Sequence, residues 1–188
     1  MELVLASASP RRRDILDAAK ISYTVCPSQA DESYPSDMEA IRVPELLARC
    51  KAEDVAATHP DAVVVGADTV VLSDGALLGK PKDRADACRM LRALSGHTHQ
   101  VVSGIAVVAN GVCYSDTVVT EVTMRPIADG EIEAYVNRDL PLDKAGAYGI
   151  QEAAGLFVSQ IHGDYYNVVG LPLCRLGQLL TEAGFPLF

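Results

Sequence analysis

The 188-residue chain lacks tryptophan, has few aromatic residues and is short of positive charge. Sixteen lysine and arginine residues face 25 aspartate and glutamate residues, which gives a formal net charge of −9. A general nucleic-acid binder needs a surplus of cations to replace phosphate counterions, so this class is excluded. The acidic total also argues against polyanionic ligands. However, screening limits the reach of surface charge to about 8–10 Å, so it is compatible with one local basic pocket.

Long apolar runs and targeting signals are missing as well. The longest stretch without Asp, Glu, Lys or Arg, residues 93–115, contains two histidines and three glycines, which predicts a β-hairpin rather than a membrane span. The N-terminus lacks the basic start and long apolar stretch of a signal peptide. The five cysteines form no C-x-x-C pair, which predicts buried free thiols in a reducing compartment. We therefore expect a cytoplasmic protein without membrane partners.

Alternating helical and extended patterns predict a mixed α/β sheet in a single domain over residues 1–188. Ser9 and Pro10 predict a capped helix start, and Asn110-Gly111 predicts a hairpin turn. Helices are expected at residues 10–19, 39–58, 83–94, 129–136 and 173–183. Strands are expected at residues 2–6, 22–26, 62–65, 70–72, 76–78, 100–108, 112–124 and 155–161.

The segment Ser7–Arg13 is a candidate anion site, because it joins a strand to a helix whose first turn carries three arginines. Free amides at a helix start attract anions, and arginine forks match phosphate oxygens. Cations at this end oppose the helix dipole, so a solvated basic turn is the alternative interpretation.

A second candidate is Gly66-Ala67-Asp68-Thr69, which is predicted to end a buried strand. Ligands of α/β sheets gather at the carboxyl ends of strands, where an aspartate can bind a divalent metal or activate water. An ordinary turn aspartate is the alternative. Gly79-Lys80 is not a phosphate-binding loop, because the glycine spacing is three residues and Pro81 replaces the required Ser or Thr. Lys80 can still contact a phosphate as a point charge.

Three further segments were considered as ligand sites. Asp143–Gln151 has two glycines and several small residues between polar groups, which favours backbone lying close to a ligand over a flexible loop. His97-Thr98-His99 would place two imidazoles on one strand face, but with no third ligand nearby a metal site is disfavoured. Tyr165-Tyr166-Asn167 fits either base stacking or ordinary packing. No G-x-S-x-G motif supports a serine hydrolase.

Together these segments resemble the Maf family of nucleoside triphosphate pyrophosphatases, essentially from end to end. The matching motifs, in order, are Leu5–Arg12, Gly66–Thr69, Lys80-Pro81, Leu94–His99, Asp143–Gln151 and Asn167–Leu173. The resemblance implies an elongated mixed sheet with flanking helices, forming two lobes around a central cleft as in inosine triphosphatases. It also implies a homodimer, and hydrolysis of the α–β phosphoanhydride of a nucleoside triphosphate with Mg²⁺ or Mn²⁺.

The resemblance further implies residue roles. Asp68 is the expected general base, Glu32 and Asp68 the metal ligands, and the expected triphosphate ligands are Ser7, Arg12, Lys51 and Lys80. The branch of the family that favours dTTP and UTP carries Arg, Thr and Gln where this chain has Arg11, Thr69 and Gln151.

The sister branch, which favours 7-methyl-GTP, tends to carry Trp, Gln and Glu at those three positions, so the dTTP/UTP branch is expected. Activity on 7-methyl-GTP and a non-catalytic, nucleotide-binding regulator of septum formation are the alternatives. The intact set of Glu32, Asp68 and Lys80 favours an enzyme. Cys50, Met124 and Glu152 depart from the family pattern, and Glu152 adjoins the specificity residue Gln151.

Overall fold

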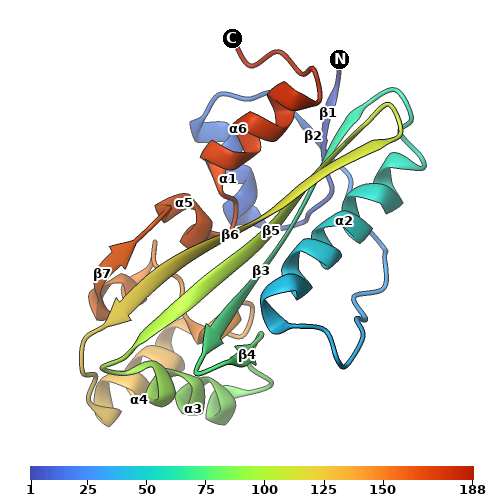
Figure 1. Ribbon diagram of the computed structural model, residues 1–188. Helices are drawn as coiled ribbons and strands as arrows, with labels where there is room; N and C mark the ends of the chain where they lie inside the picture. Colours follow the sequence, from blue (N-terminus) through green and yellow to red (C-terminus); the bar gives the residue numbers. More distant parts are fainter. The chain divides into compact units, whose positions relative to one another are not determined.

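The computed structural model describes residues 1–188 as a mixed α/β fold built on a seven-stranded sheet with flanking helices, as predicted (Figure 1). The strand order is β2-β1-β3-β5-β6-β7, and β4 pairs with β3. The strands are β1 (Leu3–Leu5), β2 (Thr24–Val25), β3 (Val63–Ser73), β4 (Ala76–Leu78), β5 (Thr98–Ala109), β6 (Val112–Met124) and β7 (Val158–His162). The α-helices are α1 (Pro10–Ala18), α2 (Val43–Ala56), α3 (Arg84–Leu94), α4 (Asp129–Asp139), α5 (Tyr165–Val169) and α6 (Leu173–Glu182). Three short 3₁₀ helices are η1 (Ala40–Arg42), η2 (Ala145–Ala147) and η3 (Ala153–Phe157).

Parallel pairing holds the first part of the sheet together. β1 pairs with β2 and with β3, with Val4 opposite Thr24 and Leu3 opposite Val63. All three residues of β1 are buried. A continuous run of Leu and Val is typical of a strand covered on both faces, which is why β1 carries no alternating polar residues.

Helix α2 lies close against this sheet because two strand residues have no side chain. A Cβ atom on Gly66 of β3 would clash with the Ala48 carbonyl oxygen of α2, and one on Gly104 of β5 would clash with the Pro44 backbone. Figure 1 shows α2 on one side of these strands and α1 and α6 on the other. The two glycines therefore set how near α2 comes to β3 and β5.

The chain divides into two compact units, each assembled from separate segments. Unit 1 comprises Met1–Thr69, Ser103–Val118 and Gly170–Phe188, and unit 2 comprises Val70–Val102 and Val119–Val169. In unit 2, α3 packs against α4 and η2 around buried residues such as Leu91 and Tyr135. The single domain and the cleft expected from the resemblance stay predictions.

Several element predictions were wrong. The strand expected to end at Val65 continues through Asp68 to Ser73, because Gly66 is a close-packing position rather than a turn. Residues 155–157 belong to η3, so β7 begins only at Val158. Tyr165–Val169 forms α5, which the sequence did not indicate.

Local expectations about Ser9 and the cysteines also need correction. Ser9 occupies the N-cap position before Pro10, but its side chain makes no capping hydrogen bond. The cysteines are free, as predicted, but none is buried: four are half-buried and Cys174 is exposed. None of the helices combines the length and the apolar character needed to cross a membrane.

Candidate active site

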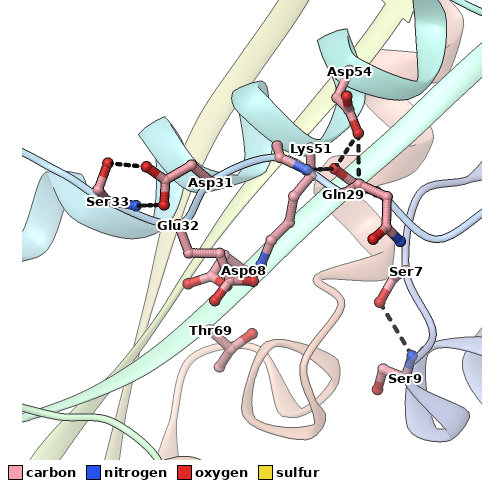
Figure 2. Close-up of polar contacts among 12 residues, drawn as sticks. Ser7, Ser9, Gln29, Asp31, Glu32, Ser33, Lys51, Asp54, Asp68 and Thr69 are labelled. Atoms are coloured by element: carbon pink, nitrogen blue, oxygen red, sulfur yellow. Dashed lines mark hydrogen bonds and ion pairs between the residues drawn. The ribbon is translucent and has the colours of Figure 1, made fainter.

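Two carboxylates and one lysine meet in unit 1 (Figure 2). The Lys51 ammonium on α2 lies 2.7 Å from Asp68 Oδ1 on β3 and 2.9 Å from Glu32 Oε1. The side chains of Lys51 and Asp68 are only 13% and 16% exposed, whereas that of Glu32 is 66% exposed. The cluster is therefore anchored inside the unit and open to solvent on the Glu32 side.

Helix α2 also holds the loop that supplies Glu32. Asp54, one turn after Lys51, accepts hydrogen bonds from the Ser28 hydroxyl at 2.7 Å and from the Gln29 amide at 2.9 Å. These two bonds hold the pKa of Asp54 below its usual range. Asp31 accepts from the Ser33 hydroxyl at 2.7 Å (Figure 2). Helix α2 thus carries Lys51 itself and, through Asp54, holds the loop that leads to Glu32.

Arg12, also in unit 1, has a guanidinium held by neutral groups. Its Nε donates to the Gly170 carbonyl at 2.9 Å, and its Nη1 donates to Ser7 Oγ at 2.9 Å. Its Nη2 donates to Thr69 Oγ1 at 3.4 Å. Burial lowers the pKa of Arg12, and the neighbouring Arg11 charge lowers it further, while Asp68 and Glu32 raise it. A half-buried cation with neutral contacts is well suited to an anionic ligand.

The structure brings together six of the nine predicted site residues within unit 1. They form the Lys51 and Arg12 groups and are Ser7, Arg12, Glu32, Lys51, Asp68 and Thr69. Arg11 lies on α1, next to Arg12. Lys80 and Gln151 belong to unit 2, where both are exposed. There, the Gly146 amide donates to the Gly79 carbonyl at 3.1 Å, which joins the segment before Gln151 to the segment of Lys80.

Sequence reasoning missed three polar groups. Ser103 is fully buried on β5, and its hydroxyl lies 2.8 Å from Thr69 Oγ1. A serine inside the apolar run 101–107 was the signal that could have found it. Lys144 is buried in unit 2 and pairs with Asp143 at 3.0 Å and with Glu152 at 3.2 Å. Glu152, noted only as a departure from the family, thus has a defined partner.

His97 and His99 do not form the predicted same-face pair, because β5 begins after His97. His97 is exposed, with Nδ1 2.8 Å from the Ser95 carbonyl oxygen. His99 is buried, with Nε2 2.7 Å from the Tyr148 hydroxyl. Burial lowers the pKa of His99 to about 4 and raises that of Tyr148, so this imidazole is neutral at neutral pH.

Only one residue of the segment Tyr165-Tyr166-Asn167 is buried. Tyr165 and Tyr166 are exposed, and their rings meet edge to face. Asn167 is buried and donates to the Val101 carbonyl and to Thr120 Oγ1, both at 3.0 Å. The asparagine therefore anchors α5 to β5 and β6, while the tyrosines face solvent.

The Glu32–Asp68 pair fits a hard divalent cation. Mg²⁺ and Mn²⁺ prefer carboxylate oxygens, and Mg²⁺ is usually held by one or two carboxylates together with water and substrate phosphates. Lys51 Nζ lies within 2.9 Å of both carboxylates, so the two carboxylates already hold one positively charged group between them. No group of three His, Cys, Asp or Glu side chains forms a cage for an ion. The donors suit a metal shared with a phosphate ligand.

The chain is similar to proteins of one family along nearly its whole length. Residues 2–183 match the family described as "Maf-like protein". A dTTP/UTP pyrophosphatase from Alkaliphilus metalliredigens (strain QYMF) is 49% identical over 183 residues, covering 96% of this chain and 95% of that protein. A dTTP/UTP pyrophosphatase from Moorella thermoacetica (strain ATCC 39073 / JCM 9320) is 49% identical over 188 residues, covering 97% and 95%. Among solved structures, a HAM1 protein from Coxiella burnetii matches with a TM-score of 0.49 and 16% identity, over 97% of this chain and 100% of that one.

Proposed function

The chain belongs to the Maf-like protein family, and we propose on this premise that it hydrolyses dTTP and UTP to the nucleoside monophosphate and pyrophosphate. The observation that carries the proposal is the meeting, within one compact unit, of Asp68, Glu32 and Lys51, together with the half-buried cation of Arg12. Carboxylates that can handle water and a metal, beside cations that can bind phosphates, are what phosphoanhydride hydrolysis requires.

Hydrolysis at the α-phosphorus forms one P–O bond to water and breaks the bond from that phosphorus to the α–β bridging oxygen. Asp68 accepts the proton of the attacking water, and pyrophosphate leaves with the bridging oxygen. Lys51 donates to Asp68 Oδ1 at 2.7 Å, which fixes the direction of the carboxylate. The cations offset charge that builds up on the phosphate oxygens.

Substrate contacts follow from the same arrangement. Ser7, Arg12, Lys51 and Lys80 are the proposed triphosphate ligands. Arg12 supports this role best, because its three protein contacts are neutral and leave its charge available. Arg11 and Gln151 are retained as residues that select the base, by contacting it or by bracing its pocket. An amide side chain can satisfy the carbonyl and N–H edge of thymine or uracil.

Glu32 and Asp68 are the proposed ligands of Mg²⁺ or Mn²⁺. When bound, the ion supplies positive charge to the phosphates and lowers the pKa of bound water. We expect EDTA to abolish pyrophosphate release and added Mg²⁺ or Mn²⁺ to restore it. Glu32→Gln should weaken Mn²⁺ binding about tenfold in a calorimetric titration, since neutralising a ligand carboxylate removes a hard anionic donor. Glu53→Gln, on helix α2, is the matched control, and equal Mn²⁺ affinity in the two variants would contradict the site.

The deciding assay measures pyrophosphate release from dTTP, UTP, 7-methyl-GTP and dATP with Mg²⁺ or Mn²⁺. We expect dTTP and UTP to be hydrolysed fastest. Equal rates on dTTP and 7-methyl-GTP would contradict the substrate branch, and release of orthophosphate instead of pyrophosphate would contradict the reaction. Nucleotide binding without turnover would instead support a regulator of septum formation.

Asp68→Asn tests the proposed general base. Turnover of dTTP should fall at least 100-fold, because the amide cannot accept the proton of the attacking water. Asp74→Asn, at an exposed turn between β3 and β4, is the matched control and should keep turnover within about twofold. Near-normal turnover in Asp68→Asn would assign the base to another residue.

A cytoplasmic location and a homodimer are proposed in addition. The five free cysteines support a reducing compartment. Size-exclusion chromatography with light scattering tests the dimer and should give about twice the mass of the 20.0 kDa chain. A mass equal to one chain at micromolar concentration would contradict it.

A further inference from the structure

The Thr69 hydroxyl is the centre of a hydrogen-bonded node within unit 1. Thr69 Oγ1 lies 2.8 Å from Ser103 Oγ, 3.4 Å from Arg12 Nη2 and 3.4 Å from the Gly170 carbonyl oxygen. Arg12 Nε donates to the same Gly170 carbonyl at 2.9 Å. The shortest bonds thus run from Ser103 to Thr69 and from Arg12 to Gly170.

The chemistry of the partners limits the directions of the bonds in this node. A hydroxyl offers one donor and two lone pairs, a guanidinium only donates and a carbonyl only accepts. Thr69 therefore accepts from Arg12 and can donate to Gly170, whereas either hydroxyl can be the donor between Thr69 and Ser103. The Thr69 hydroxyl thus contacts three protein groups, one of which is the Arg12 guanidinium.

The fold fixes Ser103 and Gly170 in place. Ser103 is fully buried on β5, so its hydroxyl has no competing solvent. Gly170 is buried and has φ +125°, a conformation that residues with side chains rarely adopt. A Cβ there would meet Thr69 Oγ1 at an ordinary 3.7 Å, so the backbone conformation rather than space calls for glycine. That conformation aims the Gly170 carbonyl at Arg12 and Thr69.

Arg12 gains a defined orientation from these contacts. Its protein partners use one N–H on each of Nε, Nη1 and Nη2. One N–H remains on each terminal nitrogen, and a phosphate can accept both. A guanidinium that is held in this way loses little freedom when an anion binds.

We infer that Ser103, Thr69 and the Gly170 carbonyl are positioning groups for Arg12, so that Thr69 acts on affinity for the phosphate chain through Arg12. This inference rests on the proposed function only in taking Arg12 as a phosphate ligand. It adds a role to the one that the sequence resemblance gives Thr69 beside Arg11 and Gln151.

The test compares Thr69→Val and Ser103→Ala with wild type, using inorganic tripolyphosphate as a probe that has no base. Each variant removes one hydroxyl from the node. Calorimetric affinity for tripolyphosphate should fall about tenfold, as expected when a charged group loses hydrogen-bonded support. The KM for dTTP and for UTP should rise by about the same factor, with kcat unchanged. Thr69→Ser keeps the hydroxyl and should restore tripolyphosphate affinity to within about threefold of wild type.

Ser95→Ala is the matched control. The Ser95 hydroxyl accepts from the Ile127 amide at 2.7 Å and belongs to unit 2, so its loss can lower Tm without touching Arg12. Tripolyphosphate affinity should stay within about twofold of wild type. If Ser103→Ala does not fold, the pair Thr69→Val and Thr69→Ser still decides the matter.

The possible outcomes separate this inference from the proposed function. Variants that bind tripolyphosphate as tightly as wild type overturn the inference even if wild type releases pyrophosphate. If wild type releases no pyrophosphate but tripolyphosphate affinity still falls in both variants and returns in Thr69→Ser, the proposed reaction fails and the inference stands.

Discussion

At the residue scale, the buried His99–Tyr148 pair ties the start of β5 to the segment that carries Gln151. The imidazole and phenol lie 2.7 Å apart at His99 Nε2, with their rings edge to face. Burial lowers the pKa of His99 and raises that of Tyr148, so the fold favours the neutral form of both groups. This contact makes stability depend on pH.

We expect stability to fall as the pH drops from about 6.5 to 4. The unfolded chain protonates His99 near pH 6.5, whereas the folded chain does so only near pH 4, so protons favour unfolding in this window. The loss should be on the order of 3 kcal/mol in the free energy of unfolding, measured by urea titration at pH 7 and pH 4.

His99→Gln supplies the comparison for this prediction. Glutamine can keep a hydrogen bond to Tyr148 but does not titrate, so this variant should lose less stability between pH 7 and pH 4. His97→Gln, at the exposed neighbour, should behave like wild type. An identical pH dependence in His99→Gln and wild type would exclude His99 as the origin.

At the scale of elements, the approach of α2 to β3 brings Lys51 to Asp68. Gly66 allows this approach, because any Cβ at that position meets the α2 backbone, including the Ala52 amide nitrogen at 2.8 Å. Small residues on α2 complete the contact, since Ala48 and Ala52 are fully buried. The geometry of the proposed catalytic cluster therefore depends on the distance between α2 and β3.

Gly66→Ala should destabilise the protein by about 2 kcal/mol or more, because the added methyl overpacks a contact between backbones. It should also lower turnover of dTTP, because moving α2 separates Lys51 from Asp68. Thermal unfolding and the pyrophosphate assay measure the two effects.

Gly130→Ala on α4 is the matched control. A Cβ there meets nothing within 4 Å, and alanine favours a helix over glycine by about 1 kcal/mol. This variant should keep or raise Tm and keep turnover. An unchanged Tm in Gly66→Ala would contradict the packing argument.

At the scale of the whole molecule, three strands contribute residues to both compact units. The chain passes from unit 1 to unit 2 within β3 after Thr69 and within β6 after Val118, and from unit 2 to unit 1 within β5 after Val102. Neither unit is a single stretch of sequence. A break in β3, β5 or β6 therefore interrupts a strand that belongs to both units.

We expect urea to unfold the chain in one cooperative transition. Far-UV circular dichroism and tyrosine fluorescence should give the same midpoint, because β3, β5 and β6 each run through both units. Tyr23 lies in unit 1 and Tyr148 in unit 2, so fluorescence samples both. Two separate midpoints would contradict the predicted single domain.

The sequence by itself determined much of this protein. Apolar periodicity located most helices and strands, because burial of one face imposes a period of 3.6 or 2 residues. The Asn110-Gly111 hairpin turn was predictable, since both residues adopt positive φ. Motif resemblance also predicted Asp68, Glu32, Lys51 and Arg12 as site residues, and all four lie in unit 1.

Only the tertiary structure decided how those residues are arranged. Arg12 and Gly170 are 158 positions apart, and Thr69 and Ser103 are 34 apart, yet each pair is joined by a hydrogen bond. Local patterns placed Asp68 at the end of a strand, whereas packing of α2 on Gly66 keeps it in the middle of β3. Such contacts depend on how close elements pack, a quantity set by the whole core rather than by neighbours in the chain.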